Sequence, residues 1–188
     1  TYNWPIGANG DITFNGGKVS LTASTYGISL NGKVSLNNCE FECTVGNQGA
    51  AIDAGDVEIN NGSVTISGGS VGIQATVRKQ DNTGSVSIKG AAVKIGTEQN
   101  KVGSGIDADE GQVSIDGTKL DIHADTRGIV GKTVVVNSGT NTIKSDEICI
   151  ESTADKISLV GGTNDFESDA SVCLGSANGI AISGGNNR

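Results

Sequence analysis

The sequence predicts an all-β fold, a right-handed parallel β-helix that forms one domain over residues 1–188. Three observations support this prediction. Short alternations of apolar and polar residues recur at intervals of twenty-odd residues along the 188-residue chain. The 29 glycines fall mainly at turns between these alternations, and there is only one proline. Aromatic residues make up 3% of the chain and methionine is absent, which favours a thin stack of Val, Ile, Leu and Ala over a thick core.

The clearest repeat unit is residues 51–70, AIDAGDVEINNGSVTISGGS. It contains three apolar/polar alternations, around Ile52, Val57 and Val64, separated by small turn residues. Each alternation is typical of a short strand with one buried face. A single unit cannot bury its apolar face alone, so we expect successive units to stack as coils of a solenoid.

The coils can be placed in order along the chain. The first covers roughly residues 4–26, and later coils begin near residues 27, 51, 72, 105, 128, 148 and 172. Their spacings range from 20 to 33 residues, whereas a left-handed hexapeptide helix keeps about 18 per turn, so the right-handed form is favoured. We expect about eight coils with three short strands each. Because the chain opens abruptly on TYNWP, we expect a fragment of a longer surface or secreted protein.

One corner of each coil, between the second and third strands, has a constant length. Its flanking inward residues are five positions apart in five coils. The turn residues are of types that tolerate the left-handed conformation and bond locally, so we expect an asparagine stack there. The flanking pairs are Phe14/Val19, Leu36/Phe41, Ile59/Val64, Ile88/Val93 and Ile115/Leu120, and the turn residues are Asn15, Asn37, Asn60, Asp116 and Asn137.

The other two corners vary in length. The longest insertions are TVRKQDNTGS at residues 76–85 and GTEQNKVGS at residues 96–104, one on each side of a first strand. Functional residues are often carried by variable loops on a rigid scaffold, so the first-strand face is the expected site.

This pattern resembles the pectin-lyase-like right-handed β-helix superfamily, in its short second-to-third corner and its variable loops around the first strand. Segments such as GISLNGKVSL from Gly27 and GIDADEGQVSI from Gly105 are similar to repeats of bacterial secreted and cell-surface proteins, some of them assigned carbohydrate binding. The resemblance implies that substrate and calcium would lie on the outer face of the first strand. Asn141 and Thr142 depart from the pattern, so we expect distortion or a cap near the C-terminal end.

Pleating predicts an outward row on the first strands, formed by Ser29, Asp53, Gln74, Asp107, Val130, Cys149 and Cys173. Arg78 and Lys79 in the adjoining loop can reach over this row, as can Arg127 and Lys132. The candidate ligand-binding residues are therefore Asp53, Gln74, Asp107, Arg78 and Lys79. Asp53 and Asp107 should be roughly 9–10 Å apart, near the upper end of the range for an inverting glycosidase pair. The alternative is a solvated polar face.

Five carboxylates near one corner form a candidate calcium site, namely Asp53, Asp56, Asp107, Asp109 and Glu110. Calcium takes six to eight oxygen ligands, and these side chains with nearby carbonyls can supply them. The spacing is not that of an EF-hand loop, and acidic turns are also common simply as solvated turns.

Two pairs of cysteines carry separate expectations. Cys149 and Cys173 occupy equivalent positions on successive coils, within reach of a disulfide, although two free outward thiols are the alternative. Cys39 and Cys43 are four residues apart, and Cys43 is expected in the core beside Phe41. Their pairing stays open.

Composition also limits the function. The net charge of −8 argues against nucleic-acid binding, and no apolar run is long enough for membrane insertion. We expect a non-catalytic, monomeric, extracellular module of a bacterial surface or secreted protein, which binds carbohydrate or serves adhesion. The alternatives are a calcium-dependent polysaccharide lyase or glycosidase acting on the first-strand face, and a passive spacer.

Tyr2 and Trp4 are expected to cap the open end of the core.

Overall fold

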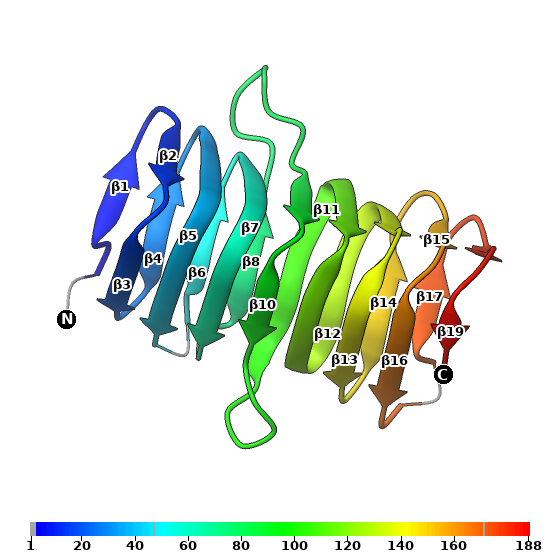
Figure 1. Ribbon diagram of the computed structural model, residues 1–188. Coiled ribbons are helices and arrows are strands. Elements are labelled where there is room, and N and C mark those ends of the chain that lie inside the picture. The colour runs from blue at the N-terminus through cyan, green and yellow to red at the C-terminus, as the bar shows by residue number, and fades with distance from the viewer. Residues whose placement is uncertain (1–2, 47, 171) are drawn as a thin grey trace.

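The computed structural model describes residues 3–46, 48–170 and 172–188 and contains β-strands only (Figure 1). The strands stack along one axis from the N-terminus to the C-terminus. They are β1 (Ile6–Ala8), β2 (Ile12–Asn15), β3 (Lys18–Ala23), β4 (Tyr26–Leu30), β5 (Lys33–Val45), β6 (Ala50–Ala54), β7 (Asp56–Ser67), β8 (Val71–Ala75), β9 (Val86–Lys89), β10 (Ala92–Ile95), β11 (Val102–Asp116), β12 (Thr118–Val136), β13 (Gly139–Ser145), β14 (Ile148–Ser152), β15 (Ile157–Leu159), β16 (Thr163–Ser168), β17 (Leu174–Ser176), β18 (Ile180–Ile182) and β19 (Asn186–Asn187).

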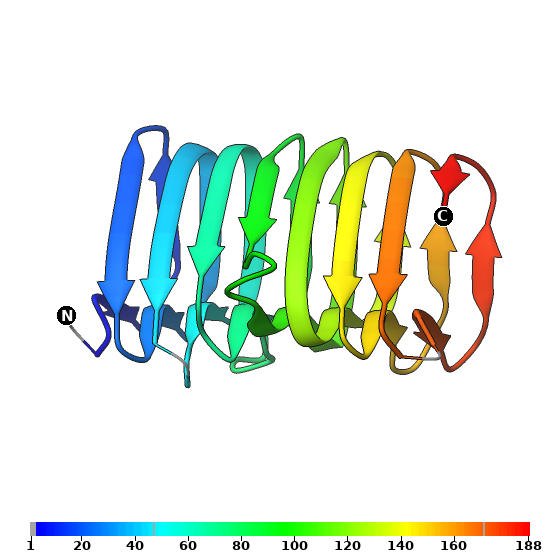
Figure 2. The ribbon, with the colours of Figure 1, turned by 90° about the horizontal axis from the view of Figure 1, so that it is seen from below.

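Every pairing between these strands is parallel and joins one coil to the next. The first strands pair in the order β1, β4, β6, β8, β11, β12, β14 and β17, which gives eight coils. Figure 2 shows the coils side by side, with β-strands on each side of the stack. The predicted fold class, a parallel β-helix of about eight coils, is confirmed. Among the described residues, no helix is long and apolar enough to cross a membrane.

The core is a set of aligned aliphatic columns inside the coils. In the first-strand column Ile28 pairs with Ile52, Ile52 with Ile73, Ile73 with Ile106 and Ile106 with Ile129, and all five are fully buried. Each side chain contacts its counterpart in the coils above and below, so burial increases with every coil added. The outermost coils have a neighbour on one side only, and their apolar residues are partly exposed.

The corner between the second and third strands has the predicted constant length, because the residues on both sides of it stay in register. These are Phe14, Leu36, Ile59, Ile88 and Ile115 before the corner and Val19, Phe41, Val64, Val93 and Leu120 after it. The predicted asparagine stack is present in the first three coils. Asn37 donates its side-chain amide to Asn15 (2.9 Å), and Asn60 donates to Asn37 (3.0 Å).

The left-handed conformation in this corner falls one residue later than predicted. Asn38 has φ of 50° and Asn61 has φ of 59°, while glycine fills the same position as Gly16, Gly90 and Gly117. Asn15, Asn37 and Asn60 keep strand geometry, and their side chains bond along the stack. The first residue of this turn thus supplies the side chain of the stack, and the residue after it adopts the left-handed conformation. Only this left-handed position needs Gly or Asn.

A second asparagine ladder lies inside the C-terminal coils, where the sequence pattern breaks down. Asn141 occupies the inward position that Leu120 fills in the coil before it, and Asn164 occupies the next. Asn141 donates to Asn164 (2.8 Å), Asn164 donates to Asn187 (2.7 Å), and Thr118 donates to Asn141 (2.9 Å). The third-strand column therefore continues as a hydrogen-bonded ladder, which corrects the expected distortion at Asn141.

The register corrects the C-terminal part of the outward row. Val130 pairs with Glu151, and Glu151 pairs with Gly175. Glu151 and Gly175 therefore continue the row in place of Cys149 and Cys173. Cys149 is fully buried. It follows Gly27, Ala51, Gly72, Gly105 and Gly128 in a column of small residues just before the buried first-strand aliphatic residue. Two consecutive residues turn inward at this corner, so the period-two alternation fails there.

The small-residue column is set by close packing against the third strand. A Cβ atom on Gly128 would lie 2.2 Å from Ile143 Cγ2 and 2.5 Å from the Cys149 carbonyl oxygen. We expect Gly128→Ala to lower the free energy of unfolding by about 1–3 kcal/mol, because the core must shift to admit the methyl group. Urea unfolding measures this loss, and Gly175→Ala is a control because nothing lies within 4 Å of its added Cβ. An equal loss in both variants would contradict the packing argument.

All four cysteines are free thiols in the structure. Cys43 is buried in the core, as predicted, and burial raises the pKa of its thiol to about 12. Cys173 is half-buried, and its carbonyl accepts the backbone N–H of Cys149 (2.9 Å). The bridge between Cys149 and Cys173 stays a prediction, now between a core thiol and a partly exposed one.

Candidate functional site

The insertion at residues 76–85 folds back over the N-terminal coils, and two of the predicted metal ligands hold it there. Asp56 accepts hydrogen bonds from Thr83 N (3.0 Å), Thr83 Oγ1 (2.8 Å) and Ser85 N (3.0 Å). Glu110 accepts one from Val77 N (2.8 Å). These two carboxylates therefore anchor the loop at both ends.

The loop places its two basic side chains on the earlier coils. Arg78 forms an ion pair with Asp53 and donates to the Leu30 carbonyl oxygen (3.1 Å). Asp53 also accepts a bond from Ser29 Oγ (3.3 Å), and it is only 4% exposed. Lys79 donates to the Asn9 carbonyl oxygen in the first coil. The predicted contact between a basic loop residue and the outward row is present at Asp53.

A groove of about 420 Å³ lies on the first-strand face next to this ion pair. Trp4 forms one wall, with 63% of its surface exposed, and its ring centroid is 6.3 Å from that of Tyr26. Asn31 donates its side-chain amide to Asn9 Oδ1 (3.0 Å) along another part of the lining. Trp4, one of the two residues predicted to cap the first coil, is thus an exposed residue of this groove. Tyr2, the other, lies outside the described residues.

A second groove, of about 440 Å³, adjoins the first at the corner beside the loop. It is lined by Gly10, Asp11, Lys33, Asp56, Lys79, Asp81 and Asn82. Lys79 links the two grooves, because its ammonium group lines the second and contacts Asn9 of the first. Together they form a polar surface that extends across several coils, with one aromatic side chain at its N-terminal end.

The remaining predicted ligand-binding residues lie further along the outward row. Gln74 is half-buried and pairs with Asp53 on one side and Asp107 on the other, so the predicted spacing of two coils is confirmed. Arg127 contacts Glu151 (3.0 Å). Burial, followed by the nearby Asp109 carboxylate, raises the pKa of Asp107, while Arg127 opposes that rise.

The pKa shift of Asp107 gives a stability prediction. Since its folded-state pKa lies above the ordinary value, charged Asp107 costs stability at neutral pH, and this cost disappears once the pH falls below the unfolded-state pKa. We expect Asp107→Asn to raise the melting temperature slightly at pH 7 and to leave it unchanged near pH 3. Calorimetry at both pH values tests this, and a lower melting temperature at pH 7 would contradict it.

The structure does not bring the five predicted calcium ligands together. Asp53 is paired with Arg78, whereas Asp56 and Glu110 bind backbone groups of the loop. Asp107 and Asp109 lie together elsewhere on the face. In the described ranges no group of three or more His, Cys, Asp or Glu side chains is arranged to hold a metal ion. Calcium binding through these residues stays a prediction.

The two insertions also differ from the expected arrangement. Residues 76–85 contact earlier coils, whereas Glu98 and Lys101 of the other insertion pair with Lys144 and Asp146 of later coils. They emerge at opposite edges of the stack in Figure 1. Sequence reasoning missed the Trp4 groove, although Trp4 next to Pro5 outside a strand pattern was the available signal.

Comparison with curated proteins and with solved structures gave no match. A family model described as "Carbohydrate-binding domain-containing protein" matches residues 1–169. This match covers all but the last coil of the solenoid, including both grooves and the 76–85 loop. The chain therefore belongs to the family of carbohydrate-binding domain-containing proteins.

Proposed function

We propose that this chain binds polysaccharide along the N-terminal part of its first-strand face, in the groove beside Trp4. The observation that carries the proposal is an exposed tryptophan on a groove of about 420 Å³ that also carries amide and hydroxyl side chains, in a chain of a carbohydrate-binding family. A sugar ring offers an apolar face for stacking on an aromatic side chain and hydroxyl groups for hydrogen bonding.

The groove supplies both kinds of contact. Trp4 offers the stacking surface, and the side chains of Asn9, Ser29 and Asn31 offer amide and hydroxyl groups. The adjoining groove with Lys33 and Lys79 extends the polar surface, which suits a chain of several sugar units. The rigid coils fix these groups before binding, so little conformational entropy is lost on association.

Two features support binding without catalysis. Asp53, which accepts a hydrogen bond from the groove residue Ser29, is 4% exposed and pairs with Arg78, and the next carboxylate in the row, Asp107, belongs to a separate cluster. A lyase or glycosidase would need a basic residue or two carboxylates converging on one cleft. In this proposal the module has the pectin-lyase-like scaffold that its repeats resemble. It acts outside a bacterial cell, where it attaches its protein to polysaccharide.

Trp4 offers a direct test because it is the only tryptophan in the chain. We expect its fluorescence to change on titration with binding oligosaccharides, and Trp4→Ala to weaken binding about 10- to 30-fold, or roughly 2 kcal/mol, because the aromatic stacking contact is lost. A panel of neutral and acidic oligosaccharides followed by calorimetry measures both wild type and variant.

Trp4→Phe serves as the matched variant, since it retains a stacking ring, and its binding should fall less than that of Trp4→Ala. Binding that survives Trp4→Ala unchanged would rule out this groove. Formation of unsaturated sugar products from any polysaccharide in the panel would instead support the lyase alternative.

A further inference from the structure

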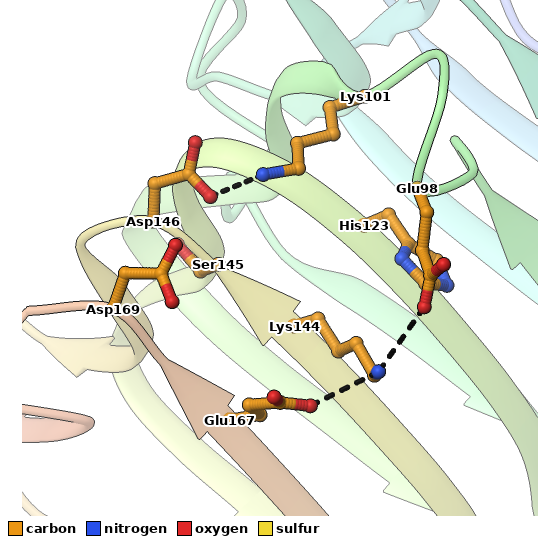
Figure 3. Close-up of a pocket in the computed structure, with 8 residues that line it drawn as sticks. All are labelled: Glu98, Lys101, His123, Lys144, Ser145, Asp146, Glu167 and Asp169. Carbon is orange, nitrogen blue, oxygen red and sulfur yellow. Dashed lines mark hydrogen bonds and ion pairs between the residues drawn. The ribbon is translucent and has the colours of Figure 1, made fainter.

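A pocket separate from both grooves lies on the third-strand side of the solenoid, beneath the insertion between β10 and β11 (Figure 3). Two ion pairs hold this insertion over later coils, Lys101 with Asp146 and Glu98 with Lys144 (3.3 Å). The pocket has a volume of about 230 Å³, below the range of drug-sized ligand sites and on the scale of one small polar ring. Its lining is Glu98, Lys101, His123, Lys144, Ser145, Asp146, Glu167 and Asp169.

His123 contributes a buried hydrogen-bonding group that lacks a partner. It is 8% exposed, and its Nε2 lies 3.1 Å from Asp121 Oδ1. In the neutral imidazole whose Nε2–H donates to this carboxylate, Nδ1 is the acceptor nitrogen. Nδ1 is buried without a hydrogen-bond partner in the described part of the chain. A buried acceptor of this kind is stabilised by a donor from a bound molecule.

The ring lines the pocket. In Figure 3 Glu98 and His123 lie on one side of the view, and Asp146 and Asp169 lie on the other. Glu98 belongs to the insertion, and its side chain is 62% exposed. Because it is exposed, this side chain can change rotamer to admit a ligand without any change in the coils.

The charges in the pocket favour a cationic ligand. Four carboxylates face two lysines, and Lys144 lies between Glu98 and Glu167 (3.0 Å). Asp169 makes no ion pair with any described residue, so its charge is available to a ligand. The two lysines remain as donors to neutral oxygen atoms. The pocket thus presents carboxylates for an ammonium group, one bare nitrogen for a hydroxyl donor, and ammonium groups for hydroxyl oxygens.

We propose that this pocket binds an amino sugar with a free amine, such as a glucosamine unit of a polysaccharide. The ammonium group of the sugar contacts Asp146 and Asp169, and one ring hydroxyl donates to His123 Nδ1. The other hydroxyl oxygens accept from Lys101 and Lys144. The choice of a sugar among amines rests on the proposed glycan binding, but the site is separate from the Trp4 groove.

The test compares a glucosamine tetramer with its fully N-acetylated counterpart, which lacks the charge. Calorimetry at low salt should show at least about tenfold tighter binding of the free-amine tetramer, since acetylation removes a charge-assisted hydrogen bond. Asp169→Asn should reduce that binding by a similar factor, and nitrogen NMR should show a shift of His123 Nδ1 on binding. Asp165→Asn is the matched control, because Asp165 lies on β16, which ends just before Asp169, pairs with Arg188 and does not line the pocket.

The outcomes separate this proposal from the first one. Trp4→Ala should leave glucosamine binding intact even where it abolishes binding in the groove. Three outcomes would overturn the amino-sugar site and leave the groove proposal untouched. They are equal affinity for both tetramers, loss of binding in Trp4→Ala but not in Asp169→Asn, and no binding of either tetramer. Butylamine binding as tightly as the tetramer would also contradict it, because the sugar hydroxyls would then contribute nothing.

Discussion

Asn164→Ala is expected to destabilise the protein by about 2–4 kcal/mol, a large effect for one polar side chain. Asn164 is fully buried, accepts from Asn141, and donates to Asn187 and to the Gly161 carbonyl oxygen (3.1 Å). Its removal leaves several buried polar groups without partners, where water cannot replace them. Thermal unfolding should show a midpoint roughly 5–15 °C lower.

Asn37→Ala provides the matched control for the buried ladder. Asn37 also accepts from one asparagine and donates to another, but it lies at a corner and is only partly buried. Water can satisfy the groups left behind, so we expect a loss of about 1 kcal/mol or less. Equal losses in the two variants would show that burial does not determine the strength of these ladders.

Oxidation of Cys149 and Cys173 is expected to raise the free energy of unfolding by about 3 kcal/mol, because a bridge restricts the unfolded chain between them. The two thiols lie on neighbouring coils, where a backbone hydrogen bond joins the residues (2.9 Å). Oxidised glutathione supplies the oxidant. Two thiols form one disulfide while one molecule of oxidised glutathione becomes two of the reduced form.

A mass decrease of two hydrogens, with a higher melting temperature that dithiothreitol reverses, measures the bridge. Cys173→Ser should abolish both changes, whereas Cys39→Ser should abolish neither, because Cys39 is buried on another strand. An oxidised protein without a raised melting temperature would indicate that the bridge strains the coils.

The coil architecture was predictable because its determinants are periodic. Alternation around residues such as Ile59 and Val64 marks each strand, and the constant second-to-third spacing sets the register from coil to coil. The prediction failed where period two fails. At Cys149 the corner turns two consecutive side chains inward. At Asn141 a polar residue fills a core position because it is hydrogen-bonded there, and a hydrophobicity pattern does not indicate this.

The candidate site was predictable only in part. The outward row indicated that Asp53, Gln74 and Asp107 share one face, and the loop beside it indicated that Arg78 reaches that face. The path of the loop depends on hydrogen bonds to Asp56 and Glu110, far apart in sequence, which no local pattern encodes. For the same reason the sequence did not indicate that Asp56 and Glu110 accept hydrogen bonds from backbone amides of the loop.

The contact between Lys79 and Asn9 has a consequence for how the solenoid opens. In a repeat array each unit is normally coupled only to its immediate neighbours, and terminal units fray first. Here the loop that leaves the fourth coil reaches the first coil through Lys79 and the second through Arg78. Amide hydrogen exchange should therefore find the first four coils protected as one cooperative block, and shortening the 76–85 loop should release the first coil to exchange on its own.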